Sequence, residues 1–432
     1  MLARVLRVPA LRVPALRKRL LWTLLAVALF RLGQTLPLPG VRVGAPTDAE
    51  ASAGDHDGGG QRLYGLVELM TGDGLGHLSV LTFGIAPFFA ARLAMGLVGS
   101  LVSRVRLLAA AGDAGAAAVA RLTRALAVLL TVVCGAVVVA AAGDGGCVPL
   151  TGVCAPGDQG PLYDGADGPL VAVALVACMA AGTTVVLLLS GLIRSRGVGD
   201  GLSVLFLAQL AAVVPDQVAG AAREVGGGRG ALVVLVVVLA LVLMTGVVVT
   251  VVQGERRIPL QQAKRMIGRR ALGPTPTYVP VRGGQGGFAV MIPASLLLLV
   301  PGPVGPWLLP AYVLVVFAHA WLRAGIEPGA VDLAQRLERS GLFIPGVRMG
   351  RSTAEYIGHV QSRIGLPAAL CMTVVALMPV VALTALDAPA DRFALSATTL
   401  LIVASTAVGT ALPAAKQLES RAALHTYAPL LR

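Results

Sequence analysis

Ten apolar runs alternate with polar connections along this chain, and most of them are long enough to cross a membrane as a helix. They lie near residues 20–38, 78–101, 125–142, 170–192, 202–219, 231–252, 287–304, 307–322, 364–385 and 393–411. A membrane-spanning helix needs about 20 apolar residues, because the hydrocarbon core of a bilayer is about 30 Å thick. The pattern therefore predicts an all-α polytopic membrane protein with ten transmembrane helices.

The stretch from Leu63 to Leu101 departs from this simple alternation. Its first apolar run, Leu63 to Met70, is too short to cross the hydrocarbon and ends at the polar, glycine-rich residues 71–74. Irregular backbone at membrane depth is tolerated only where it is buried in protein or lines a cavity. The stretch is typical of a half-inserted element inside a pore or cleft, followed by a span that begins near Leu78. An external loop followed by an ordinary helix is the alternative.

Glycine, proline and helical spacing give three local predictions. The glycines between Gly197 and Gly201 permit a tight turn that leads directly from the fourth span into the fifth. The fifth span is expected to stop near Pro215, because proline removes a helical hydrogen bond. Residues 331–340 place Leu333 and Leu337 on one helical face, which predicts a short helix in a polar connection.

Composition supports the membrane location. Hydrophobic residues make up 56% of the 432-residue chain and charged residues 13%, whereas soluble domains carry about 25% charged residues. The mean hydropathy is +0.81. The chain is therefore expected to be an integral membrane protein.

The 35 lysines and arginines are sorted by position and set the predicted orientation. Nearly all lie at the two ends of the chain and in alternate connections. The remaining connections hold only Arg42, Arg62, Arg223, Arg229 and Arg392, and the spans themselves contain Arg31 and Arg92. Positively charged connections stay in the cytoplasm, so both termini are predicted to be cytoplasmic. The net charge of +13 thus reflects topology and gives little support to nucleic-acid binding.

Two long basic connections, residues 253–287 and 323–363, project on the predicted cytoplasmic side. Each is longer than a simple turn between helices needs to be. We interpret them as a docking surface for a cytoplasmic partner. The alternative is that their charge only enforces topology.

The sequence contains little catalytic chemistry. No pair of acids lies within a span, and His319 is the only imidazole in one, where packing is the simpler role. Cys147 and Cys154 share one predicted external connection, as a disulfide or as two free thiols. The other cysteines are expected to be core residues of the spans: Cys134, Cys178 and Cys371. An enzyme, a metal site and a cofactor are not expected, and an ion-coupled secondary transporter would need intramembrane acids that the spans lack.

Five motifs resemble those of one known family in their order and spacing. They are FRLGQTLPLPGV, LVELMTGDGLGHLSVLTFGIAPF, RSRGVGDGLS, GERRIPLQQAKRMIGRR followed by TYVPV, and SGLFIPGVRMGRSTAEYI. The chain resembles, from about residue 17 to its last span, the SecY family, the central subunit of the bacterial protein-conducting channel.

This resemblance implies ten helices in two pseudosymmetric five-helix halves, near 1–220 and 221–432, around a central pore. A plug near residues 63–76 is expected to seal the pore from outside. An apolar ring at the waist is implied by alignment at Ile85, Phe89, Phe206, Ile292 and Ile402. Val67 and Met70 would be plug residues, and Met70 would face this ring. The physical role fits, because a narrow apolar constriction loses its water and blocks ions.

The resemblance also implies the function and its partners. The channel would translocate unfolded, signal-bearing preproteins across the cytoplasmic membrane of a bacterium and release membrane proteins into its lipid. Small SecE- and SecG-like subunits would join it, and the motor ATPase SecA and the ribosome would dock on the basic loops. The matching docking residues are Arg256, Arg257, Lys264, Arg265 and Arg348.

Several positions depart from the family pattern. Ser190-Gly191 stands where the family usually has Gly-Glu, and Arg92 occupies a place where small or apolar residues are usual. A specialised accessory copy of the channel is therefore an alternative to the main one. Because Ile85, Phe89 and Arg92 share one helical face, Arg92 is expected to face the pore. The alternative is that its side chain extends along a neighbouring helix.

Overall fold

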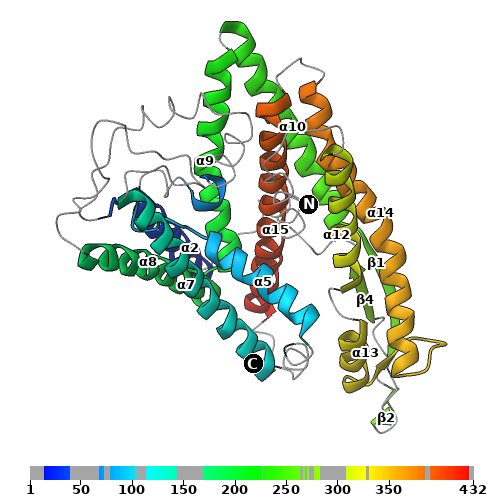
Figure 1. Cartoon of the computed structure of the whole chain (residues 1–432). Helices are drawn as coiled ribbons and strands as arrows, with labels where there is room; N and C mark the ends of the chain where they lie inside the picture. The colour runs from blue at the N-terminus through cyan, green and yellow to red at the C-terminus, as the bar shows by residue number, and fades with distance from the viewer. Residues whose placement is uncertain are drawn as a thin grey trace. The chain divides into compact units, whose positions relative to one another are not determined.

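A computed structural model gives the fold of the chain. It describes residues 14–38, 68–72, 78–102, 105, 113–143, 169–225, 227–262, 266–267, 270–271, 277–282, 308–326, 330–384 and 390–427. Within these ranges long helices dominate, as the hydrophobic pattern predicts (Figure 1). The predicted span near 287–304 lies outside the described residues.

The long helices match the other predicted spans. They are α2 (Pro14–Thr35), α5 (Ala86–Leu101), α7 (Asp113–Gly143), α8 (Pro169–Arg196), α9 (Gly201–Val225), α10 (Gly227–Gln253), α12 (Leu308–Ile326), α14 (Arg351–Thr384) and α15 (Ala390–Tyr427). Among the described helices, α7, α8, α9, α10 and α14 each contain a window long and apolar enough to cross a membrane. The prediction of an all-α polytopic membrane protein is thus confirmed.

Contacts group the chain into two compact units. One comprises Met1–Gly230 with Thr410–Arg432, and the other comprises Ala231–Gly409. The last part of α15 therefore packs with the first unit. The two pseudosymmetric halves inferred from the family resemblance stay a prediction.

In the first unit, the start of the second span is not helical. Expected near Leu78, the helix α5 begins only at Ala86, and residues 78–85 form turns. Gly84 interrupts the helical path with a φ of 49°, a region that is strained for residues with a Cβ. The preceding turns pair instead with the end of α2, where the Leu38 amide donates to the Leu78 carbonyl at 2.9 Å.

The helix of the fifth span is longer than expected. Helix α9 continues through Pro215 to Val225. A proline removes one backbone hydrogen bond without ending a helix whose later residues gain other contacts. Here Gln217 supplies one such contact, because its amide donates to a carboxylate oxygen of Glu68 at 3.0 Å.

The tight turn between α8 and α9 forms as predicted. Gly199 has a φ of 88°, and a Cβ at Gly201 would lie 2.0 Å from the Ser190 carbonyl oxygen. The turn is anchored on both sides, because the Val198 amide donates to Thr23 Oγ1 and the Gly199 amide donates to Gln417 Oε1.

The second unit contains a small sheet that the all-α prediction did not include. Strand β1 (Glu255–Gln262) pairs antiparallel with β4 (Thr277–Arg282), and its far end pairs with β5 (Leu342–Phe343). A separate short pair joins β2 (Met266–Ile267) to β3 (Arg270–Ala271). Both basic connections thus contribute strands to one sheet, and the short helix α13 (Ala330–Arg339) lies where helical spacing predicted it.

Candidate functional site

Two aromatic rings of the predicted apolar ring touch within the first unit. Phe89 of α5 and Phe206 of α9 meet edge to face, with ring centroids 5.0 Å apart and an interplanar angle of 67°. Both are buried, as is Ile85 at the start of α5. Such an aromatic pair contributes about 0.5–1.5 kcal/mol beyond its buried area. An apolar contact between two predicted spans is therefore present where the family resemblance places the constriction.

Two glutamines, one on α2 and one on α9, donate hydrogen bonds to residues 68–72, here named the 68–72 turn. Gln209 Nε2 donates to the Leu69 carbonyl at 2.7 Å. Gln34 Nε2 donates to the Thr71 carbonyl at 3.4 Å and to Gln209 Oε1 at 3.3 Å. Gln209 is 0% exposed and Gln34 4% exposed. Buried polar groups of this kind are held in place, because breaking their bonds leaves unsatisfied donors and acceptors.

Two charged residues, Arg31 and Glu68, form hydrogen bonds in and beside this turn. Arg31, whose charge lies inside a predicted span, donates from Nη1 to Gln34 Oε1 at 2.7 Å. At the start of the turn, Glu68 accepts a hydrogen bond from Gln217 at 3.0 Å. The intramembrane arginine thus has a specific partner in the structure.

Two glycines make room for the 68–72 turn. A Cβ on Gly72, which has a φ of 73°, would lie 2.4 Å from Gln34 Nε2. A Cβ on Gly84, which has a φ of 49°, would lie 2.7 Å from the Thr71 carbonyl oxygen. Both positions therefore require glycine for backbone conformation and for space.

The other predicted pore and plug residues are placed less completely. Met70 is half-buried in the 68–72 turn, and Ile402 is buried within the second unit. Ile292 and Val67 lie outside the described residues. Arg92 is exposed, and its predicted orientation toward the pore stays a prediction. The sequence reasoning missed Gln34 and Gln209, although two amides inside apolar spans were a signal for them.

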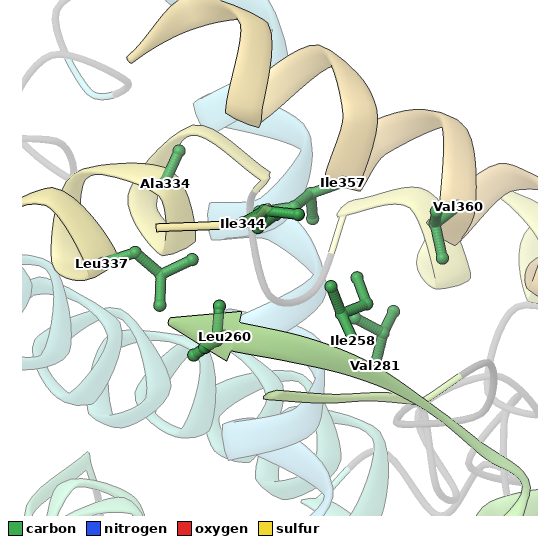
Figure 2. Close-up of a cluster of buried hydrophobic side chains, with 8 residues drawn as sticks. All are labelled: Ile258, Leu260, Val281, Ala334, Leu337, Ile344, Ile357 and Val360. Atoms are coloured by element: carbon green, nitrogen blue, oxygen red, sulfur yellow. The ribbon is translucent and has the colours of Figure 1, made fainter. Parts of the chain in front are cut away.

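The two basic connections form one folded body, here named the loop subdomain: β1, β4, β5, α13 and the first turns of α14 up to Val360. Figure 2 shows its core, with side chains from the strands facing those of the two helices. The core residues are Ile258, Leu260, Val281, Ala334, Leu337, Ile344, Ile357 and Val360. A packed core indicates that the predicted docking surface is a rigid platform and not two separate loops.

Arg256 and Arg257 lie on the strand β1 of this platform and are exposed. The Arg257 side chain is 63% exposed, 3.1 Å from Glu255 Oε1, and its guanidinium lies 4.8 Å from the centre of the Tyr278 ring. A cation–π contact at an exposed site contributes about 0.5–1 kcal/mol. The contact orients the guanidinium while leaving it accessible to a partner.

Arg348 projects from a turn that is fixed by its backbone. Gly346 and Gly350 flank it with φ values of 80° and 92°, and its carbonyl accepts a hydrogen bond from Thr353 Oγ1 at 2.8 Å. Ile344, at the start of the turn, is part of the subdomain core. The exposed Arg348 side chain itself is not part of that core. Lys264 and Arg265 lie outside the described residues.

The prediction that the cysteines of the spans are core residues is partly wrong. Cys134 and Cys371 are exposed on the structure and Cys178 is half-buried, so the first two are not core residues. In a membrane protein apolar residues also cover the surface that meets lipid, and composition alone does not separate the two environments. Cys147 and Cys154 lie outside the described residues. Within the described ranges, no three His, Cys, Asp or Glu side chains gather into a metal site.

Known proteins share both the sequence and the fold. A family model described as SecY matches residues 79–411. The chain is 34% identical to the protein translocase subunit SecY of Streptomyces galbus, over 98% of each chain. The chain belongs to the SecY family. It is 31% identical to the SecY subunit of Mycobacterium bovis, over 98% of this chain and 99% of that one.

Solved structures agree with the SecY family fold. One, described as the structure of a protein conducting channel, matches with a TM-score of 0.59 at 14% identity, covering 94% of this chain and 93% of the other. A second, of a SecY protein whose plug domain stabilises the closed state of the channel, matches with a TM-score of 0.55 at 15% identity, with the same coverage. As a SecY family member the chain is a multi-pass membrane protein and a subunit of a protein-conducting channel, a family of channels and not of enzymes.

Proposed function

We propose that this chain forms the central pore of a channel through which unfolded, signal-bearing preproteins cross the cytoplasmic membrane of a bacterium. The same pore releases membrane proteins sideways into lipid. The observation that carries the proposal is the 68–72 turn, held between α2 and α9 by buried hydrogen bonds. Phe206 and Gln209 lie one turn apart on α9, so the turn is held next to the Phe89–Phe206 contact.

This arrangement gives the pore two seals with different properties. The apolar contact between α5 and α9 excludes water and ions without binding them. The 68–72 turn closes the same region with polar bonds that a moving polypeptide can replace. A channel for proteins needs both, because it must block ions when idle and admit an extended chain when active.

The loop subdomain is proposed to receive the cytoplasmic partners. A SecA-type motor ATPase and the ribosome would bind at its exposed arginines, Arg256, Arg257 and Arg348. Cationic groups on a rigid platform speed association with acidic partners and fix their orientation. With the loops in the cytoplasm, the basic ends of the chain would also lie there.

Small membrane subunits of the SecE and SecG kind are proposed to bind the outer helices. Helix α10 is almost wholly apolar, and Leu235, Leu239 and Val242 are among its exposed side chains. Such a surface meets lipid or a partner helix. Purification in mild detergent should therefore co-isolate single- or double-span partners, and isolation of the chain alone would contradict this part of the proposal.

The test of the main proposal is translocation in a defined system. The chain is reconstituted into liposomes with its small subunits, a SecA-type ATPase, ATP and a radiolabelled precursor. We expect precursor to become protected from external protease, and to lose protection when the liposomes are dissolved. Absence of protection with a system in which the Streptomyces galbus relative is active would overturn the proposal.

A further inference from the structure

A row of side-chain amides connects α2 and α9 to the 68–72 turn. Gln34 on α2 and Gln209 on α9 are 175 residues apart in the chain, yet Gln34 Nε2 lies 3.3 Å from Gln209 Oε1. Both amides are buried, and both also donate to backbone carbonyls of the turn. Gln34 lies within the motif FRLGQTLPLPGV and Gln209 lies outside the five family motifs. The contacts of the two side chains indicate their role.

The direction of the hydrogen bonds is determined at both ends of the row. Arg31 can only donate, so the Gln34 atom that it contacts must be the oxygen. The Leu69 carbonyl can only accept, so the Gln209 atom that it contacts must be the nitrogen. The remaining contact then runs from Gln34 Nε2 to Gln209 Oε1, which is the assigned arrangement. Each side chain in the row thus donates a hydrogen bond to the next, and the last bond is donated to a carbonyl of the turn.

The surroundings leave this row little freedom. A Cβ on Gly72 would lie 2.4 Å from Gln34 Nε2 and 2.7 Å from Gln209 Cγ. Gly84 is similarly close, since a Cβ there would lie 2.9 Å from Gln209 Oε1. The two glycines therefore let the backbone approach the amides directly.

We propose that Gln34 and Gln209 are a latch that holds the 68–72 turn in the closed position and sets how often the idle channel opens. The inference rests on the proposed channel function and names two positioning residues for it. In the closed state the latch satisfies its own amides and two carbonyls of the turn. When the turn leaves, these groups lose their partners, which opposes opening in a site that excludes water.

The chemistry of the latch also suits its release by any client. Each glutamine donates to a backbone carbonyl of the turn. An extended polypeptide that enters the pore presents the same carbonyls at every residue, whatever its sequence. The client can therefore take over the hydrogen bonds that the turn gives up, and opening does not depend on a particular client side chain.

The first test replaces the glutamines by an apolar residue of similar size. Gln209→Leu and Gln34→Leu channels are reconstituted in planar bilayers, and the idle ion conductance is measured with no client or motor present. We expect the open fraction to rise roughly tenfold in each, equivalent to about 1.4 kcal/mol. The control is Thr183→Val, which removes the buried 3.0 Å contact between Thr131 Oγ1 of α7 and Thr183 Oγ1 of α8. Wild-type conductance in both glutamine variants, or an equal rise in the control, overturns the latch.

A second variant tests the hydrogen bond itself. In Gln209→Glu, a protonated carboxyl can donate to the Leu69 carbonyl as the amide does, whereas a carboxylate can only accept. We expect idle conductance near that of the wild type at acidic pH and a rise as pH increases. Arg31 and Glu68, the ionisable groups in this network, are common to both proteins, so the wild-type profile is the reference. A variant profile that parallels the wild type overturns the latch.

A further variant distinguishes failure of the latch proposal from failure of the proposed channel function. Deleting residues 63–73 removes most of the expected plug and should raise idle conductance if the channel function is right. If the deletion leaks and Gln209→Leu does not, the latch is wrong and the channel stands. If the deletion does not leak and the reconstituted chain translocates no precursor, the proposed function is wrong.

Discussion

Replacing Gly84 by alanine should separate the strain of the backbone from closure of the pore. An alanine at this position meets two penalties. Its φ of 49° is strained for any residue with a Cβ, at about 1–2 kcal/mol. Its Cβ would also lie 2.7 Å from the Thr71 carbonyl oxygen, whereas ordinary contacts begin near 3.4 Å. Only the second penalty depends on the 68–72 turn being in place.

The effect on closure follows from that contact. The Thr71 carbonyl must retreat by about 0.7 Å, the difference between 3.4 and 2.7 Å, and its hydrogen bond from Gln34 is already 3.4 Å long. Losing that bond destabilises the closed state by about 0.5–1.5 kcal/mol. The open fraction of the idle channel should therefore rise roughly 2- to 13-fold, from the same range of free energy.

The matched control is Gly199→Ala. Gly199 has a φ of 88°, so alanine there is strained in the same way, but its neighbours are Val204 and Ala414 and not the turn. The backbone strain should lower the free energy of unfolding of both variants by about 1–2 kcal/mol. Only Gly84→Ala should raise idle conductance in planar bilayers. Equal conductance in the two variants would refute the reasoning, whether both leak or neither does.

Three further predictions concern the loop subdomain and Arg92. Arg348→Glu should leave the chain inserted and stable but abolish SecA-driven translocation. The control is Arg121→Glu, an exposed change on α7 outside the subdomain, which should leave translocation intact. Normal translocation in the Arg348→Glu variant would contradict the docking role. Leu337→Ala should destabilise the subdomain core by about 2–5 kcal/mol, seen as faster proteolysis of residues 253–363, with idle conductance unchanged; unchanged proteolysis would argue against the shared core. In a cysteine-free background, Arg92→Cys should react with a membrane-impermeant thiol reagent added from the cytoplasmic side, and no reaction there would turn Arg92 away from the pore.

The position of the loop subdomain in the chain has a consequence for these assays. Its core lies within residues 258–360 and belongs to the second unit, whereas the glutamine latch belongs to the first. Mutations in the two places should therefore produce different defects. Changes at the platform should reduce driven translocation, and changes at the latch should alter the idle channel.

The sequence alone determined which segments become helices. Apolar runs of membrane length predict helices at every described span, because the backbone must satisfy its hydrogen bonds internally in lipid. The tight turn at Gly199 and the amphipathic helix α13 were also predictable, since a positive φ and helical spacing are local properties. The family motifs predicted a constriction at Phe89 and Phe206 and docking residues on two basic connections.

Only the tertiary structure decided where those elements begin, end and meet. Helix α5 begins late because residues 78–85 pair with the end of α2, a contact between segments about 40 residues apart. Helix α9 passes Pro215, and β5 joins the two basic connections into one sheet. Local sequence rules do not encode such pairings, because a hydrogen bond between distant segments depends on the fold that brings them together.

The glutamine latch shows most clearly that local sequence rules do not encode contacts between distant segments. Gln34 and Gln209 are single polar residues in apolar spans, and such residues can face a partner, a pore or only their own helix. Their contacts with each other, with Arg31 and with the 68–72 turn exist because α2 and α9 pack on either side of that turn. Likewise, hydrophobicity could not separate the buried Phe206 from the exposed Cys371, because in a membrane apolar residues cover the outer surface as well as the interior.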